Sequence, residues 1–252
     1  MDFSDQALIF KLGKFKEADL WVRLISPDRG VYTAFAFGGS RSIRRFCGCL
    51  DVLNIVSARV EASRTKEYMV LREASLISCP SRLRTDLGRL GIAVNCLKFM
   101  EAFDIPPDCA AASYQLVNQL LALLEEDDNP PPLLPNLFRF CFASLQGFAP
   151  QINICRICKA DLSHFSDYYF QTVEGGIICP ECLRKSRPGP YVRLCKDALT
   201  ALQIVQQGQP HAWKHIDFGF NREMRAQCAD AIDGFIHYHV GLAWQGNYFK
   251  RV

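Results

Sequence analysis

The sequence predicts an α+β protein in which a five-stranded barrel, residues 1–80, precedes an α-helical domain, residues 81–252. The first observation is a change of hydrophobic period at Pro80. Before it, apolar residues alternate with a period of about 2, and after it they recur with a period of about 3.6. The second observation is a double cysteine pair, which predicts a small insert in the helical domain at residues 152–186.

The predicted barrel contains five short segments rich in β-branched and aromatic residues, which favour β-strands. These segments are residues 7–10, 20–25, 31–37, 50–60 and 68–77. Ser26-Pro27-Asp28-Arg29-Gly30 is typical of a hairpin turn, because proline restricts φ and glycine tolerates positive φ. Five short strands of this kind fit a small closed barrel, for which the oligonucleotide-binding (OB) fold is the usual architecture.

The C-terminal part has the apolar spacing of amphipathic helices. The predicted helices are residues 81–103, a second that begins at Pro106-Pro107-Asp108, and then residues 133–147, 194–206 and 222–244. We expect the last two to pack on the helices between residues 81 and 147.

Composition limits the class of protein. Of the 252 residues, 49% are hydrophobic, which suffices for two or three domains. No run approaches the roughly 20 apolar residues of a bilayer span, and the first residues lack the pattern of a signal peptide. We therefore expect a cytoplasmic protein that does not contact membranes. Because that compartment is reducing, the 12 cysteines are expected to be free thiols or metal ligands.

The double cysteine pair predicts a structural zinc site. Cys155-Arg156-Ile157-Cys158 and Cys179-Pro180-Glu181-Cys182 each bring two thiolates to one side of a tight turn. Two such pairs on neighbouring hairpins complete a tetrahedron of sulfurs at the Zn–S distance of about 2.3 Å, as in zinc ribbons. Four protein ligands leave no position open for water, so this zinc-ribbon-like site is not expected to be catalytic. An iron–sulfur or rubredoxin-like site and cysteines without metal are the alternatives.

Basic residues in the predicted barrel are candidates for binding nucleic acid. Residues 1–100 contain 16 Lys and Arg and 10 Asp and Glu, whereas residues 101–150 contain 1 basic and 7 acidic residues. Charges in loops would neutralise phosphates and release counterions. The predicted DNA-binding residues are Lys11, Lys14 and Lys16 in the first turn, Arg29 in the second, and Arg41, Arg44 and Arg45 after the third strand. An ordinary solvated surface is the alternative for these residues.

Aromatic residues are interleaved with these basic residues. They are Phe15, Trp21, Tyr32, Phe35 and Phe37. Some could stack on bases, but we expect most of them to form the barrel core. The sequence contains no phosphate-binding glycine motif, no G-x-S-x-G elbow and no H-E-x-x-H motif, so it does not favour an enzyme.

Several motifs resemble the RecO family of bacterial recombination mediators. They are Glu17-Ala18-Asp19-Leu20-Trp21-Val22, Gly30 and Gly38 around the third strand with the arginine-rich loop that follows, Leu83-Arg84-Thr85-Asp86-Leu87, Leu145-Gln146-Gly147-Phe148-Ala149-Pro150 before the first cysteine pair, and Gly175-Gly176-Ile177-Ile178-Cys179. The resemblance implies an OB-fold DNA-binding domain, a helical domain with a zinc-bearing insert, and a nucleoid-associated location. It also implies binding of single- and double-stranded DNA and annealing of complementary strands.

The implied protein partners are RecR, the single-strand-binding protein and, indirectly, RecA. Two other functions remain open from the residues alone. One is a zinc-ribbon adaptor that binds only proteins, with the barrel as a peptide platform. The other is a nucleic-acid-modifying enzyme, which would need a catalytic constellation that the sequence does not display.

Overall fold

The computed structural model describes residues 2–185, 189–208, 210–216 and 219–252. Residue 186, the predicted end of the insert, lies outside these ranges. The chain divides into two compact units: Met1–Asp86 with Ile105–Leu121, and Leu87–Asp104 with Ala122–Val252. We describe each unit by itself.

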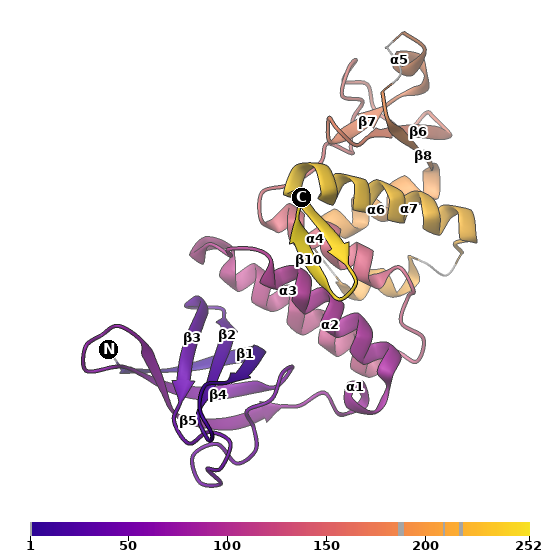
Figure 1. Cartoon of the computed structure of the whole chain (residues 1–252). Helices are drawn as coiled ribbons and strands as arrows, with labels where there is room; N and C mark the ends of the chain where they lie inside the picture. Colours follow the sequence, from indigo (N-terminus) through magenta and orange to yellow (C-terminus); the bar gives the residue numbers. More distant parts are fainter. Residues whose placement is uncertain (1, 186–188, 209, 217–218) are drawn as a thin grey trace. The chain divides into compact units, whose positions relative to one another are not determined.

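The first unit contains a closed five-stranded barrel, drawn in indigo and purple in Figure 1. Its strands are β1 (Asp2–Lys14), β2 (Leu20–Ser26), β3 (Gly30–Ala36), β4 (Ile55–Ala62) and β5 (Met69–Ser78), arranged in the order β1-β2-β3-β5-β4. All neighbouring strands are antiparallel except the pair β3 and β5. This arrangement confirms the predicted OB-like barrel.

Strand β1 closes the barrel because it pairs along its length with two different strands. Asp2 to Leu8 pair with β4, and Leu8 to Lys14 pair with β2. The two stretches meet at Leu8, and an irregularity in the pairing with β2 follows between Ile9 and Lys11. A bulge bends a strand and increases its twist, which allows a single strand to join both edges of the sheet.

The barrel interior is filled by aliphatic side chains more than by aromatic rings. In β3, Tyr32, Ala34 and Ala36 are buried, and Phe35, between them, is only half-buried. The expectation that most of the aromatics form the core is therefore wrong, since only Tyr32 of the five belongs to it. The reason is the alternation of side chains along a strand: Tyr32, Ala34 and Ala36 point inward in β3, so Phe35 lies on the outer surface.

Several predicted boundaries also differ. The fourth strand begins at Ile55 rather than at residue 50, because Cys47 to Leu53 form turns. The predicted helix 81–103 is two helices, α1 (Ser81–Thr85) and α2 (Leu87–Glu101), separated by Asp86 in an extended conformation. Strand β1 extends to Lys14, so Lys11 and Lys14 lie in a strand rather than in the first turn.

The second unit is helical and carries a small sheet. Its helices are α2, α4 (Leu134–Leu145), α5 (Pro180–Lys185), α6 (Lys196–Gln206), the short helix η1 (Pro210–His215), α7 (Arg222–Phe235) and the π-helical turn η2 (Ile236–Val240). The helix α3 (Pro107–Glu126) contributes to both units. Helices α6 and α7 pack on α4, as predicted. Strands β6 (Asp167–Gln171), β7 (Gly176–Ile178) and β8 (Tyr191–Cys195) form a sheet in the order β7-β6-β8.

The C-terminus differs most from the prediction. The expected helix 222–244 ends earlier, because Gly241 adopts a φ of 69° and terminates the π-turn. A hairpin of β9 (Leu242–Gln245) and β10 (Tyr248–Arg251) follows. Similarly, the predicted helix 194–206 begins only at Lys196, because the two residues before it complete β8.

None of the described helices has the length and hydropathy that a membrane-spanning helix requires.

Candidate metal centre and nucleic-acid interface

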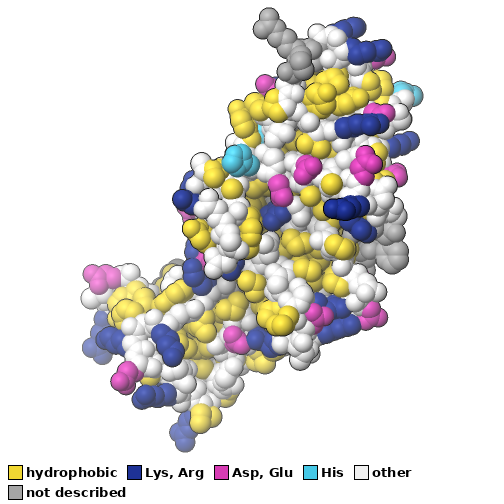
Figure 2. Space-filling model, turned by 45° about the vertical axis from the view of Figure 1, so that its right-hand side comes forward, with side chains coloured by type: hydrophobic (Ala, Val, Ile, Leu, Met, Phe, Trp, Pro, Cys, Tyr) yellow, Lys and Arg dark blue, Asp and Glu magenta, His cyan; other side chains and the backbone are white. Residues whose placement is uncertain are grey.

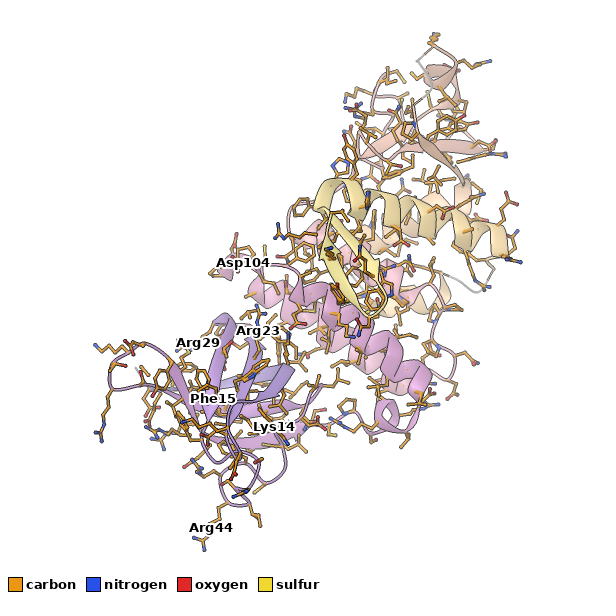
Figure 3. All side chains as sticks on the ribbon, in the orientation of Figure 1. Lys14, Phe15, Arg23, Arg29, Arg44 and Asp104 are labelled. Atoms are coloured by element: carbon orange, nitrogen blue, oxygen red, sulfur yellow. The ribbon has the colours of Figure 1, made fainter. Side chains whose placement is uncertain are left out.

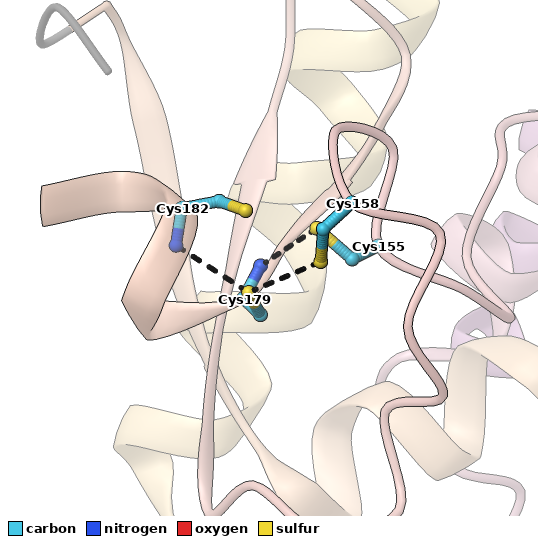
Figure 4. Close-up of side chains that lie close together, drawn as sticks. All are labelled: Cys155, Cys158, Cys179 and Cys182. Carbon is cyan, nitrogen blue, oxygen red and sulfur yellow. Dashed lines mark hydrogen bonds between the residues drawn. The ribbon is translucent and has the colours of Figure 1, made fainter. Parts of the chain in front are cut away.

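The structure brings the four predicted zinc ligands together. The sulfur atoms of Cys155, Cys158, Cys179 and Cys182 all lie within 4.8 Å of one another, and those of Cys158 and Cys179 are 3.9 Å apart (Figure 4). Tetrahedral zinc with Zn–S bonds of about 2.3 Å separates its sulfurs by about 3.8 Å. The four residues therefore fit a tetrahedral metal ion.

Local backbone geometry positions the cysteines. The first pair lies in a tight turn in which the N–H of Lys159 donates to the carbonyl of Cys155 over 2.9 Å, and Lys159 has a φ of 62°. The second pair begins where β7 ends and continues into α5. Gly175, at a φ of 62°, allows the chain to reverse between β6 and β7.

The electrostatics of the thiols favour a bound cation. Burial raises the pKa of the Cys155 thiol, but N–H donors of Cys158, Cys179 and Ile157 outweigh burial and lower this pKa to about 6. By contrast, burial and the neighbouring thiols raise the pKa of Cys182 to about 12. Four thiolates this close repel one another, and a coordinated divalent cation removes that repulsion.

The cysteine-bearing segment is attached to the helices by specific contacts. The amides of Gln203 and Gln206 in α6 donate to the carbonyls of Ile152 and Pro150, over 3.0 and 2.9 Å. A ring nitrogen of His239 lies 2.9 Å from the carbonyl oxygen of Thr172. A metal ion held by all four cysteines would cross-link the two turns that carry them and so stabilise this part of the helical unit.

A second group of residues forms an exposed aromatic patch on the barrel. We use this name for Phe15, Phe35, Phe37 and Tyr68. The ring of Phe35 lies 5.2 Å from that of Phe15 and 5.6 Å from that of Tyr68, and Phe37 is within 6.4 Å of both Phe35 and Tyr68. Phe15 is 52% exposed and Tyr68 is 42% exposed. Exposed rings of this kind can stack on nucleic-acid bases.

Trp21 extends the patch toward β1. It lies directly opposite Phe35 in the antiparallel register and opposite Gly13 on its other side. A Cβ atom at Gly13 would lie 2.4 Å from the indole ring, so only glycine lets the indole approach the strand this closely. The ammonium group of Lys11 lies 5.9 Å from the centre of this ring, which is a cation–π distance.

Substitution of Gly13 tests this close approach. We expect Gly13→Ala to displace the indole of Trp21 and to change the intrinsic tryptophan fluorescence, while the barrel keeps its fold. The same substitution in a Trp21→Phe background provides the control, because it should leave the fluorescence unchanged. An identical spectral change in both backgrounds would show that another tryptophan is responsible.

The predicted DNA-binding residues do not all lie together. Residues 15–19 and the loop after β3 meet at one end of the barrel, where the N–H of Ser40 donates to the carbonyl of Ala18 over 3.1 Å. Lys14, Lys16, Arg41, Arg44 and Arg45 belong to this end. Arg29 lies in the turn between β2 and β3, and Figure 3 shows it at the opposite end of the barrel from Arg44. Its guanidinium lies 3.8 Å from the centre of the Phe3 ring.

The three arginines of the loop after β3 have different surroundings. Arg45 donates to the carbonyl of Phe37 over 2.5 Å and covers the ring of Phe46, so it holds the loop. Arg41 forms an ion pair of 3.7 Å with Glu17, but both side chains are highly exposed and such pairs contribute little. Arg44 is exposed and projects from the end of the barrel (Figure 3).

Tyr68 and its loop were not among the residues predicted from the sequence to bind DNA. Residues 63–68 connect β4 to β5 and contain Arg64 and Lys66, both exposed. The parallel pairing of β3 with β5, with Phe35 opposite Val70, brings this loop beside the aromatic patch. A tyrosine and two basic residues between the fourth and fifth strands are the signal that could have identified it. Figure 2 shows hydrophobic side chains interspersed with basic and acidic ones over the barrel.

These features define an OB-fold protein with a four-cysteine centre in its helical part. Residues 1–80 match the family described as "Recombination protein O N terminal", and residues 84–247 match "Recombination protein O C terminal". The chain is 44% identical over 255 residues to the "DNA repair protein RecO" of Nitratidesulfovibrio vulgaris, and 42% identical over 252 residues to that of Oleidesulfovibrio alaskensis. It is 36% identical over 256 residues to that of Lawsonia intracellularis, and each alignment covers 100% of both chains.

The chain therefore belongs to the RecO family of DNA repair proteins.

Proposed function

We propose that this protein is a recombination mediator that binds single- and double-stranded DNA, anneals complementary strands and, with RecR, helps to load RecA onto single-stranded DNA covered by the single-strand-binding protein. The observation that carries the proposal is the aromatic patch on the outside of the barrel, with cationic residues around it. Membership of a DNA repair family supports it.

The proposed DNA-binding domain is the barrel, residues 1–80. Bases of a single strand would stack on Phe15 and Tyr68, which present exposed rings. Lys16, whose ammonium lies 5.6 Å from the Phe15 ring centre, and Lys11, beside Trp21, would neutralise the neighbouring phosphates. Charge neutralisation reduces the repulsion between two complementary strands, which is the physical requirement for annealing.

The four-cysteine centre is proposed to hold one structural zinc ion. A set of four sulfur ligands suits zinc or iron, and closed coordination favours a structural role. The role as a mediator requires positioning of DNA and proteins rather than making or breaking covalent bonds, so we propose that the protein is not an enzyme. A cytoplasmic, nucleoid-associated location follows from this role.

Charge reversal of the exposed loop arginines tests the proposal. We expect Arg41→Glu with Arg44→Glu to weaken binding of a single-stranded oligonucleotide and to lower the slope of log K against log salt by about 1.4, since each lost phosphate contact contributes about 0.7. Fluorescence anisotropy over a salt titration measures both quantities. Arg45 is kept, because it holds the loop.

The control is Arg193→Glu, which removes a cation from the second unit, where it pairs with Asp167. An unchanged salt slope in the Arg41/Arg44 variant would refute the assignment of these residues. Absence of any accelerated annealing of two complementary oligonucleotides by the unmodified protein would favour the adaptor function instead.

A further inference from the structure

We propose that Ile43 is an apolar wedge that inserts between adjacent stacked bases of duplex DNA and unstacks them. The proposal rests on the proposed DNA-binding function and assigns a residue to one step of it, the local opening of a base stack. It concerns the loop that connects β3 to β4, and within it residues 37–47.

The first observation is the exposure of an isoleucine. The side chain of Ile43 is 83% exposed, and among the large apolar side chains of the described residues only that of Leu87, at 84%, exceeds it. Burial of such a side chain is strongly favourable, and the chain itself does not provide it here. The loop thus presents an apolar group to the surroundings.

The second observation is that hydrogen bonds hold the loop. The N–H groups of Arg41 and Ser42 donate to the carbonyl of Gly38 over 3.2 and 3.0 Å. The thiol of Cys47 donates to the carbonyl of Ile43 itself over 2.9 Å. Because these bonds already order the loop, insertion of its tip costs less conformational entropy than insertion of a flexible segment.

The third observation is the charge next to the apolar tip. Arg41 and Arg44 lie two residues before and one residue after Ile43, and both are exposed. Figure 3 shows Arg44 at the projecting end of the barrel. An exposed apolar residue with an arginine close by on each side in the sequence matches a stack of bases bordered by phosphates. Architectural DNA-binding proteins insert Ile, Leu, Phe or Met between base steps in this way.

The loop also begins at the aromatic patch. Phe37, at the start of the loop, contacts Phe35 and Tyr68 of the patch. Phe35 and Phe37 of the patch therefore lie on the same chain segment as Ile43, while Phe15 and Tyr68 join them from neighbouring loops. A base released from its stack by Ile43 would have aromatic rings on the same protein domain on which to stack, which lowers the net cost of unstacking.

The experiment uses the full-length protein and a duplex oligonucleotide that contains 2-aminopurine, whose fluorescence rises when it is unstacked. We expect the unmodified protein to increase this fluorescence at saturation. Ile43→Ala should abolish the increase and weaken duplex binding about tenfold, since most of the buried apolar surface is lost. Its affinity for a single strand, in which stacking is weaker, should change less than about threefold.

Three further variants separate the wedge from other effects. Ile43→Met keeps an apolar tip and should retain the fluorescence increase. Arg44→Gln should weaken both kinds of DNA binding in a salt-dependent manner but retain the increase at saturation. Leu87→Ala removes a side chain of nearly equal exposure from the second unit. It should change neither the DNA affinity nor the fluorescence increase.

The wedge is refuted if the unmodified protein binds the duplex without a fluorescence increase, or if Ile43→Ala retains that increase. It is also refuted if Ile43→Ala weakens single-strand and duplex binding equally. If the unmodified protein binds neither kind of DNA, the proposed function itself fails, and this outcome is distinct from failure of the wedge alone. Circular dichroism melting of Ile43→Ala should match that of the unmodified protein, because the side chain is exposed.

Discussion

Replacement of Cys179 by serine is expected to abolish binding of the proposed metal ion and to destabilise the second unit by more than about 4 kcal/mol, in the range typical of the loss of a structural metal. Cys179 is buried and central to the site: its sulfur lies 3.9 Å from that of Cys158, and its N–H donates to the sulfur of Cys155 over 3.4 Å. For a unit of this size, we expect the melting temperature to fall by on the order of 10 °C. Metal analysis and thermal melting measure the two effects.

Cys195→Ser is the matched control for this prediction. Cys195 is a half-buried thiol at the end of β8, outside the four-cysteine group, and serine is well suited to its position at the start of α6. This variant should retain one equivalent of metal and its stability. The elemental analysis also distinguishes zinc from iron. Retention of a full equivalent of metal by Cys179→Ser would contradict the assignment of this ligand.

The Cys179→Ser variant also tests whether the four-cysteine centre takes part in DNA binding. We expect Cys179→Ser to lose stability first and DNA binding only as a consequence of unfolding, because the four-cysteine centre and the barrel belong to different units. A folded variant that has lost DNA binding would instead assign the centre to recognition.

The second large effect is expected from the aromatic patch. Replacement of both Phe15 and Tyr68 by alanine should weaken binding of a single-stranded oligonucleotide by about 2 to 6 kcal/mol, because each stacked base contributes about 1 to 3 kcal/mol. Both side chains are substantially exposed, so the barrel should remain folded. Anisotropy titrations at several salt concentrations measure the affinity. The salt slope should not change, since stacking involves no counterion release.

Tyr238→Ala provides the control for the patch. Tyr238 is 55% exposed, comparable to Phe15 and Tyr68, but it lies in the π-turn of the second unit. Its replacement should leave single-strand affinity unchanged. Equal losses from Tyr238→Ala and from the Phe15/Tyr68 variant would show that the barrel is not the stacking surface.

The features that were predicted correctly depend on residues close together in the chain. Alternation of apolar residues identified the strands of the barrel, and C-x2-C spacing identified Cys155, Cys158, Cys179 and Cys182 as one group, which the structure brings together. The alternation and the C-x2-C spacing are each defined over a few consecutive residues, so both can be recognised before the fold is known. The family resemblance came from similarly short motifs and is confirmed.

Which side chains meet on the outer surface of the barrel depends on strand pairings between residues that are distant in the sequence. The parallel register of β3 and β5 places Tyr68 against Phe35, which lies more than thirty residues earlier. The antiparallel course of β2 and β3 separates Arg29 from Arg44, although they belong to neighbouring loops in the sequence. Composition and periodicity carry no information on strand order or direction, and these decide which side chains meet. The sequence alone therefore specified the barrel and the four-cysteine group, whereas the tertiary structure decided which aromatic and basic residues form a common surface.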